Sequence, residues 1–61
     1  MEKLIKETNQ IIVDMGAGNL AEANNKLLER LVSADNPKEQ DKIQSDINLL
    51  NMRIRLDMES K

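Results

Sequence analysis

Two amphipathic segments of the chain are joined by a short turn sequence, Ser33-Ala34-Asp35-Asn36-Pro37-Lys38-Glu39. Asn36 is a favoured helix N-cap residue, and Pro37 suits the first helical position, where an N–H would have no intrahelical partner. The turn therefore predicts that one helix ends near residue 34 and that another begins at residue 37. We assign Asp35, Asn36 and Pro37 as the turn residues.

A second break lies upstream, at Gly16-Ala17-Gly18. Asn19 follows this break and precedes Glu22 by three residues, which is the spacing of a helix N-cap with a capping box. The two breaks divide the chain into three expected helices, at about residues 2–15, 20–34 and 37–60. No segment alternates with the two-residue period of a strand for long, so the expected fold class is all-α.

Apolar residues in the last two segments recur at the spacing of one helix face. A short turn between them predicts an antiparallel helical hairpin, in which the two apolar faces pack together. The expected hairpin core consists of Leu20, Leu27, Leu31, Ile43, Ile47, Leu50 and Ile54. The glycines allow the first segment to turn in a new direction, so we expect a separate N-terminal helix. Residues 1–61 then form one helical-hairpin domain, with residues 1–18 as its mobile part.

The last segment also carries a second apolar stripe, which a two-helix hairpin leaves uncovered. This stripe lies about 180° around the helix from the core face. One interpretation is that the N-terminal helix folds back over it and closes a three-helix bundle. The favoured interpretation is a contact with another subunit or a partner, because small domains with uncovered apolar faces usually associate. The candidate interface residues are Leu49, Met52, Leu56, Ile11 and Ile12.

The composition excludes most kinds of chemistry. The 61 residues include 9 Lys and Arg, 11 Asp and Glu, and no His, Cys or aromatic residue. The formal net charge of −2 does not suit a nucleic-acid surface, and no apolar run is long enough to span a membrane. Without His and Cys, the commonest general base and the usual zinc ligands are missing. We therefore expect no enzyme, no catalytic residue, no metal site and no cofactor. Arg53 and Arg55 are two residues apart and are followed by the acidic residues Asp57 and Glu59, so we interpret them as part of a solvated face.

Several short motifs occur in a fixed order along the chain. The first motif is Asp14-Met15-Gly16-Ala17-Gly18-Asn19-Leu20, and the second is Lys26-Leu27-Leu28-Glu29-Arg30-Leu31. They are followed by Ala34-Asp35-Asn36-Pro37, and then by Gln44-Ser45, Ile47 and Asn51. This series resembles the needle-filament subunits of bacterial type III secretion systems, which carry D-x-G-x-x-N-L, A-L-x-K-L, a proline-containing turn, and Q-S ahead of N-L-Y-R. The resemblance covers residues 10–58. It departs from the family where N-L-Y-R is reduced to Asn51-Met52-Arg53, and members of the family continue past the position of Lys61.

The resemblance implies a structural role for a helical hairpin. Needle subunits are exported without a cleaved signal and stack into a hollow helical tube on the bacterial surface, through which other proteins pass unfolded. The implied partners are further copies of the chain, cytosolic export chaperones before secretion, and a needle-tip protein. The implied location is the cytoplasm before export and the bacterial cell surface after it.

Two other functions are left open by the sequence. A small helical-hairpin co-chaperone or adaptor of a secretion system fits the length of the chain well and the D-x-G-x-x-N-L motif less well. A dimeric four-helix bundle that binds RNA has a suitable size. The acidic balance and the lack of aromatic stacking residues argue against RNA binding.

Overall fold

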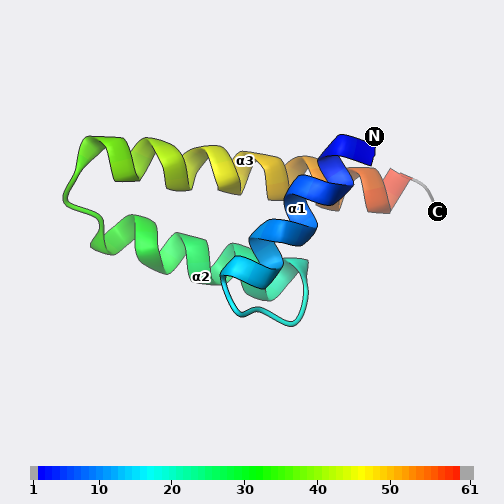
Figure 1. Ribbon diagram of the computed structural model, residues 1–61, viewed down its shortest axis with the longest axis horizontal. Coiled ribbons are helices and arrows are strands. Elements are labelled where there is room, and N and C mark those ends of the chain that lie inside the picture. The colour runs from blue at the N-terminus through cyan, green and yellow to red at the C-terminus, as the bar shows by residue number, and fades with distance from the viewer. Residues whose placement is uncertain (1, 60–61) are drawn as a thin grey trace.

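The computed structural model describes residues 2–59, which form three α-helices joined by two short connections (Figure 1). Helix α1 spans Glu2–Asp14, α2 spans Leu20–Ser33 and α3 spans Pro37–Glu59. The predicted all-α class is confirmed, and residues 2–59 contain no strand. The helix ends lie within one residue of their expected positions, except that the predicted end at residue 60 lies outside the described residues.

The connection between α1 and α2 begins with a defined helix ending. Gly16 has a φ of +65°, and the N–H groups of Gly16 and Ala17 donate to the carbonyl oxygens of Val13 and Ile12, both at 3.0 Å. These two bonds form a Schellman motif, which places one residue in the left-handed region and so favours glycine there. Lys26 Nζ of α2 lies 3.3 Å from the carbonyl oxygen of Gly16, so a cation also caps the end of α1.

The starts of α2 and α3 carry the predicted asparagine caps. Asn19 Oδ1 accepts a hydrogen bond from the N–H of Glu22, and Asn36 Oδ1 accepts one from the N–H of Lys38, both at 2.8 Å. The Glu22 carboxylate reaches back to the N–H of Gly18, one residue before the cap, at 2.9 Å. These side chains satisfy donors that the first turn of a helix leaves unpaired, so both helices begin at fixed points.

Helices α2 and α3 lie side by side and run in opposite directions, an arrangement compatible with the predicted hairpin (Figure 1). The residues buried between the helices are mostly aliphatic and come from all three of them. They are Ile11, Ala23, Leu27, Ile43, Ile47 and Leu50. Leu20 and Leu31 are half-buried and pack against this cluster, whereas Ile54 is half-buried further along α3. Along α3, the core is therefore confined to the first 14 residues, Pro37–Leu50.

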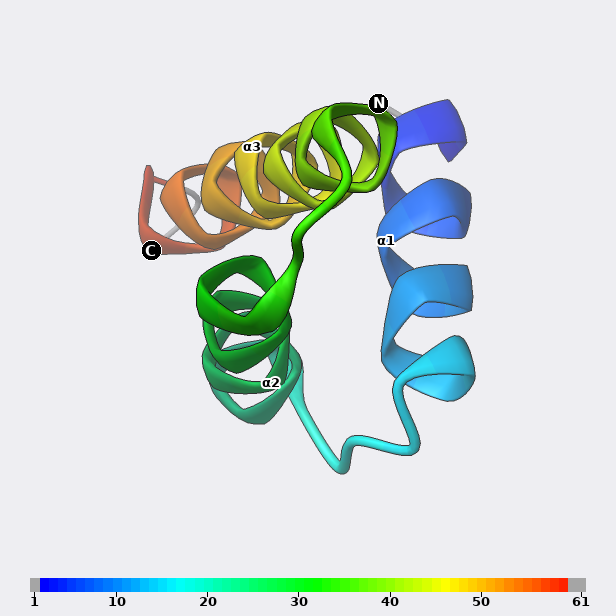
Figure 2. The same cartoon turned by 90° about the vertical axis from the view of Figure 1, so that its left-hand side faces the viewer.

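Helix α1 crosses the other two helices (Figure 2). Its first turns lie beside the second half of α3, and its last turn lies near the start of α2 (Figure 1). Ile11 is buried in the common core, and Ile12 and Met15 pack against that core. Ile11 and Ile12 were expected at an external interface. Ile11 is buried and Ile12 is half-buried because α1 folds back across α2 and α3 instead of standing apart from them.

Helix α3 is much longer than the helix beside it. It has 23 residues and α2 has 14, which correspond to roughly 34 Å and 21 Å at 1.5 Å per residue. The short turn places α2 against the first part of α3. The last turns of α3, from about residue 51, consequently extend past α2 along the 38 Å long axis of the molecule (Figure 1).

Truncation of Leu50 tests how far the chain depends on its small core. Leu50 is fully buried, so Leu50→Ala is expected to lower the free energy of unfolding by about 2–5 kcal/mol. A chain of this length has a total stability of roughly 3–9 kcal/mol, so the variant should lose much of its helical signal at room temperature. Urea unfolding followed by circular dichroism measures this loss. The control is Val13→Ala, at a position that is 71% exposed, and equal losses in both variants would contradict the assigned core.

Candidate functional site

The last turns of α3 expose apolar side chains in the part of the helix that extends past α2. Met52 is 57% exposed and Met58 is 72% exposed. Met52 and Met58 are six residues apart, so they lie about 120° apart around the helix and expose apolar area on two of its sides. We call this region the α3 end surface. It consists of Met52, Ile54, Leu56 and Met58 of α3, together with Leu4 of α1 and Leu20 of α2.

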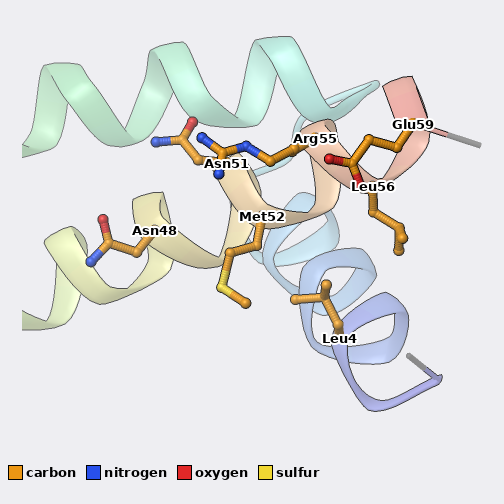
Figure 3. A pocket seen from close by; sticks show the side chains of 7 residues that line it. All are labelled: Leu4, Asn48, Asn51, Met52, Arg55, Leu56 and Glu59. Carbon is orange, nitrogen blue, oxygen red and sulfur yellow. The ribbon is translucent and has the colours of Figure 1, made fainter.

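One part of the α3 end surface is a groove beside α1 (Figure 3). The groove has a volume of about 660 Å³ and is lined by Leu4 of α1 and by Asn48, Asn51, Met52, Arg55, Leu56 and Glu59 of α3. Met52 and Leu56 supply its apolar floor, Leu4 forms its wall on the α1 side, and the polar side chains form its rim. In Figure 3, Arg55 extends along α3 toward Asn51. An apolar floor with a polar rim is typical of a surface that receives an amphipathic helix.

The other part of the α3 end surface lies next to the start of α2. Leu20, Ile54, Asp57 and Met58 line a hollow of about 410 Å³ there. Leu20 and Ile54 were expected in the hairpin core. The structure places them at its edge, half-buried, because α2 begins at Leu20 and has no further turn with which to cover Ile54.

The predicted second stripe is only partly covered by α1. Leu49 is half-buried and packs against the core, Leu56 is half-buried, and Met52 is largely exposed. The first residue of the stripe therefore contributes to folding. Of the five candidate interface residues, Met52 and Leu56 line the groove, whereas the other three pack in or against the core.

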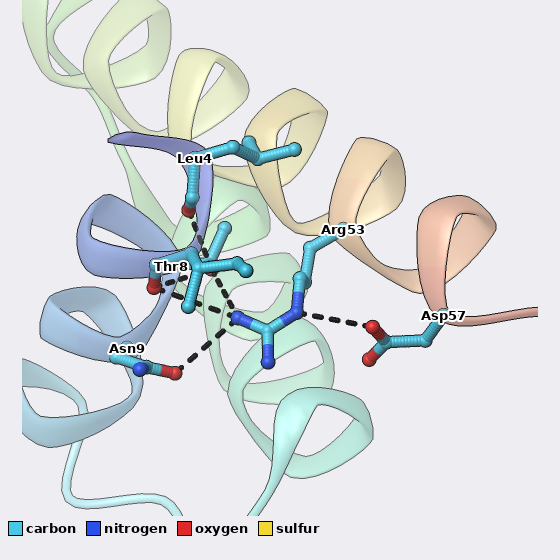
Figure 4. Close-up of polar contacts among 6 residues, drawn as sticks. Leu4, Thr8, Asn9, Arg53 and Asp57 are labelled. Atoms are coloured by element: carbon cyan, nitrogen blue, oxygen red, sulfur yellow. Dashed lines mark hydrogen bonds and ion pairs between the residues drawn. The ribbon is translucent and has the colours of Figure 1, made fainter. Parts of the chain in front are cut away.

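Helix α1 is fixed against α3 by one arginine side chain (Figure 4). Arg53 Nη1 donates to Thr8 Oγ1 at 2.9 Å, to Asn9 Oδ1 at 3.3 Å and to the carbonyl oxygen of Ile5 at 3.5 Å. Arg53 Nε donates to Asp57 Oδ1 at 3.2 Å. The Arg53 side chain is 18% exposed and Thr8 is fully buried, so water competes weakly for these bonds. We call the contact between Arg53 and α1 the Arg53 latch.

Thr8 occupies a position at the centre of the apolar face of α1, between Leu4 and Ile11. Its hydroxyl donates to the carbonyl oxygen of Leu4 at 2.7 Å, which leaves the hydroxyl oxygen free to accept from Arg53. This pair was not predicted from the sequence, where Thr8 had no assigned role and Arg53 was expected on a solvated face. The available signal was a threonine in the middle of an apolar helix stripe.

Other kinds of site find no support within the described residues. No three acidic side chains among residues 2–59 converge in a way that could hold a metal ion. In the same range, no helix combines the length and apolar character needed to cross a membrane. Comparisons with protein-family models, with curated proteins and with solved structures give no match to this chain.

Replacement of Arg53 by methionine tests the latch. The variant keeps an unbranched side chain but loses every donor to α1, and it leaves the buried Thr8 hydroxyl without that partner. Hydrogen bonds to charged groups contribute roughly 1.5–3 kcal/mol, so amide hydrogens of α1 should exchange roughly 10- to 100-fold faster. Hydrogen exchange followed by NMR reports each helix separately. In the matched control Arg55→Met, which alters an exposed arginine on the same helix, α1 should be unaffected. Equal acceleration in both variants would show that the latch does not hold α1.

Proposed function

We propose that the chain is a structural subunit that polymerises into a hollow helical filament, the extracellular needle of a type III secretion system. In this proposal, α2 and α3 are the antiparallel hairpin of the subunit, and α1 is a separate segment folded across it. Two motifs support the proposal by their place in the fold. The run 14–20 joins the end of α1 to the start of α2, and the run 34–37 forms the turn between α2 and α3.

The observation that carries the proposal is the exposed apolar surface at the end of α3. Within residues 2–59, no helix covers Met52 or Met58. Helix α2 is too short to reach this part of α3, and the Arg53 latch holds α1 to one side. Full burial of one methionine side chain stabilises by about 1.5–3 kcal/mol relative to exposure. Association that covers both side chains is therefore favoured.

The position of this surface supports an open polymer. A filament grows through heterologous contacts, in which two different surfaces of each subunit meet and do not close a ring. The α3 end surface lies toward one end of the 38 Å long axis (Figure 1). A copy bound there leaves the opposite end of the molecule accessible to the next copy.

The proposal also assigns partners and a location. Before export, a cytosolic chaperone would cover the groove with an apolar helix face and so keep the subunit monomeric. After secretion, subunits would add to the filament at the cell surface, where a needle-tip protein binds its end. The role is structural and uses no catalytic residue, metal ion or cofactor.

A second candidate function is a small helical adaptor of a secretion system. The packing of α1 against the other two helices favours the adaptor function. Helix α1 contributes Ile11 to the core, and Leu49 of α3 is partly buried against that core. The three helices then form a self-contained unit that offers the groove to a single helix of a client protein. Such an adaptor would form one-to-one complexes and would not polymerise.

A lysine at Met52 tests assembly through the α3 end surface. Met52→Lys places a charge on the floor of the groove, where burial against another subunit would cost several kcal/mol. The parent chain is expected to form larger species with rising concentration in sedimentation velocity, and the variant is expected to remain monomeric with unchanged helical content. The control is Val13→Lys, which makes the same charge change at an exposed position of α1 and should assemble like the parent. Leu56→Asp should behave like Met52→Lys.

Cell fractionation distinguishes the filament subunit from the adaptor. In a bacterium that produces the chain, a needle subunit should be recovered with appendages sheared from the cell surface. That fraction should lose the chain when export is blocked. Recovery only from the cytosol, in a stable complex with one client protein, would instead establish the adaptor function.

A further inference from the structure

We infer that the groove beside α1 receives α2 of a second copy of this chain, through an exposed ridge on the outer face of that helix. The ridge, which we call the α2 ridge, consists of Ala21, Leu28 and Val32. The pairing rests on the proposed filament function and provides the second surface that such a filament requires.

The α2 ridge is the most exposed aliphatic surface on α2. Val32 is 88% exposed and Leu28 is 44% exposed, one helical turn apart. Ala21 is exposed on the same line, two turns before Leu28. The core of the molecule lies on another face of α2, where Ala23 and Leu27 are buried. The ridge is therefore left without cover by its own chain.

The α2 ridge and the groove match in spacing. Leu28 and Val32 are four residues apart, as are Met52 and Leu56, so each pair spans about 6 Å along its helix. Rows of side chains four residues apart pack between the equivalent rows of a facing helix in the commonest form of helix packing. Leu4 forms the wall of the groove on the α1 side. The ridge of one copy would thus be held between two helices of the next (Figure 3).

The charges beside the two surfaces are complementary. Glu29 flanks the α2 ridge and Arg55 stands at the rim of the groove, and both side chains are exposed. Neither side chain has an ion pair or hydrogen-bond partner within residues 2–59. Opposite charges across an interface guide the encounter and fix its orientation. The groove also carries Glu59, so a symmetric pairing of two grooves could set Arg55 of each copy against Glu59 of the other, but it would leave Val32 uncovered. The exposed Val32 therefore favours the ridge over a second groove.

The α2 ridge and the groove are different surfaces, and the ridge runs along α2 from Ala21 in its first turn to Val32 in its last turn, away from the groove. The α2 ridge extends into the last turn of α2, next to the turn that leads into α3, and the groove lies on the last turns of α3 (Figure 1). A contact between them is heterologous, so every oligomer keeps one free ridge and one free groove. Growth can continue at both ends, as a filament requires.

Complementation between two variants tests the pairing. Val32→Lys disrupts the ridge and keeps the groove, whereas Met52→Lys disrupts the groove and keeps the ridge. Each variant alone is expected to remain monomeric in sedimentation velocity. A one-to-one mixture is expected to form dimers that do not grow, because it offers one intact ridge for one intact groove. Val13→Lys is again the control, with the same change in charge and assembly like that of the parent.

The possible outcomes separate the pairing from the filament function. If Val32→Lys assembles like the parent while Met52→Lys does not, the filament function is retained and the α2 ridge is not the partner surface. A mixture that stays monomeric would also overturn the pairing. If the parent chain itself stays monomeric at every concentration, self-assembly of this chain, and with it the proposed filament function, fails first.

Cysteine cross-linking gives an independent readout, since the chain contains no cysteine. A double variant with Val32→Cys and Met52→Cys, treated with a short bismaleimide, should yield a ladder of covalent oligomers. Each single variant should yield little product. Abundant covalent dimers from Met52→Cys alone would indicate a symmetric pairing of grooves and would overturn the proposed contact.

Discussion

The unequal length of the two antiparallel helices is the constraint on which the rest of the structure depends. Helix α3 has 23 residues and α2 has 14, and the turn between them is too short to shift α2 along α3. The first 14 residues of α3, Pro37–Leu50, therefore have a partner on their apolar face, and the last nine do not. The buried residues Ile43, Ile47 and Leu50 lie in the first part, whereas the exposed Met52 and Met58 lie in the second. The folding core and the surface proposed for assembly thus lie on different parts of one helix.

The position of α1 follows from a polar contact as much as from apolar packing. A buried hydroxyl and a shielded guanidinium form a contact that is weaker than well-packed aliphatic side chains would be, but it has one geometry. Because Arg53 must reach Thr8, α1 is held on the side of α3 that Arg53 faces and does not move around the helix to cover Met52. The Arg53 latch thus fixes one wall of the groove and also limits how much of α3 its own chain can cover.

The local structure was predictable because its signals are local. The caps at Asn19 and Asn36 and the helix ending at Gly16 act through hydrogen bonds to neighbouring backbone groups, and such bonds depend on sequence over four or five residues. The path of α1 was not predictable in the same way. It depends on a contact between Thr8 and Arg53, which are far apart in sequence, and periodicity treats a threonine as polar and an arginine as solvated. The partial covering of Leu49 and the burial of Ile11 follow from that path.

A small core without aromatic residues leaves this chain with more apolar surface than it can bury alone. Only six hydrophobic residues are buried within residues 2–59, although 39% of the sequence is hydrophobic. Chains of this size bury about 60% of the surface that they expose when unfolded, so their stability is small and each further contact is a large fraction of it. If α1 were longer or α2 began earlier, the remaining side chains could be covered and the monomer would be more stable. Such a chain would no longer expose Met52 and Met58, which belong to the surface proposed for assembly. The exposed apolar side chains are therefore consistent with a subunit whose folding is completed by its neighbours.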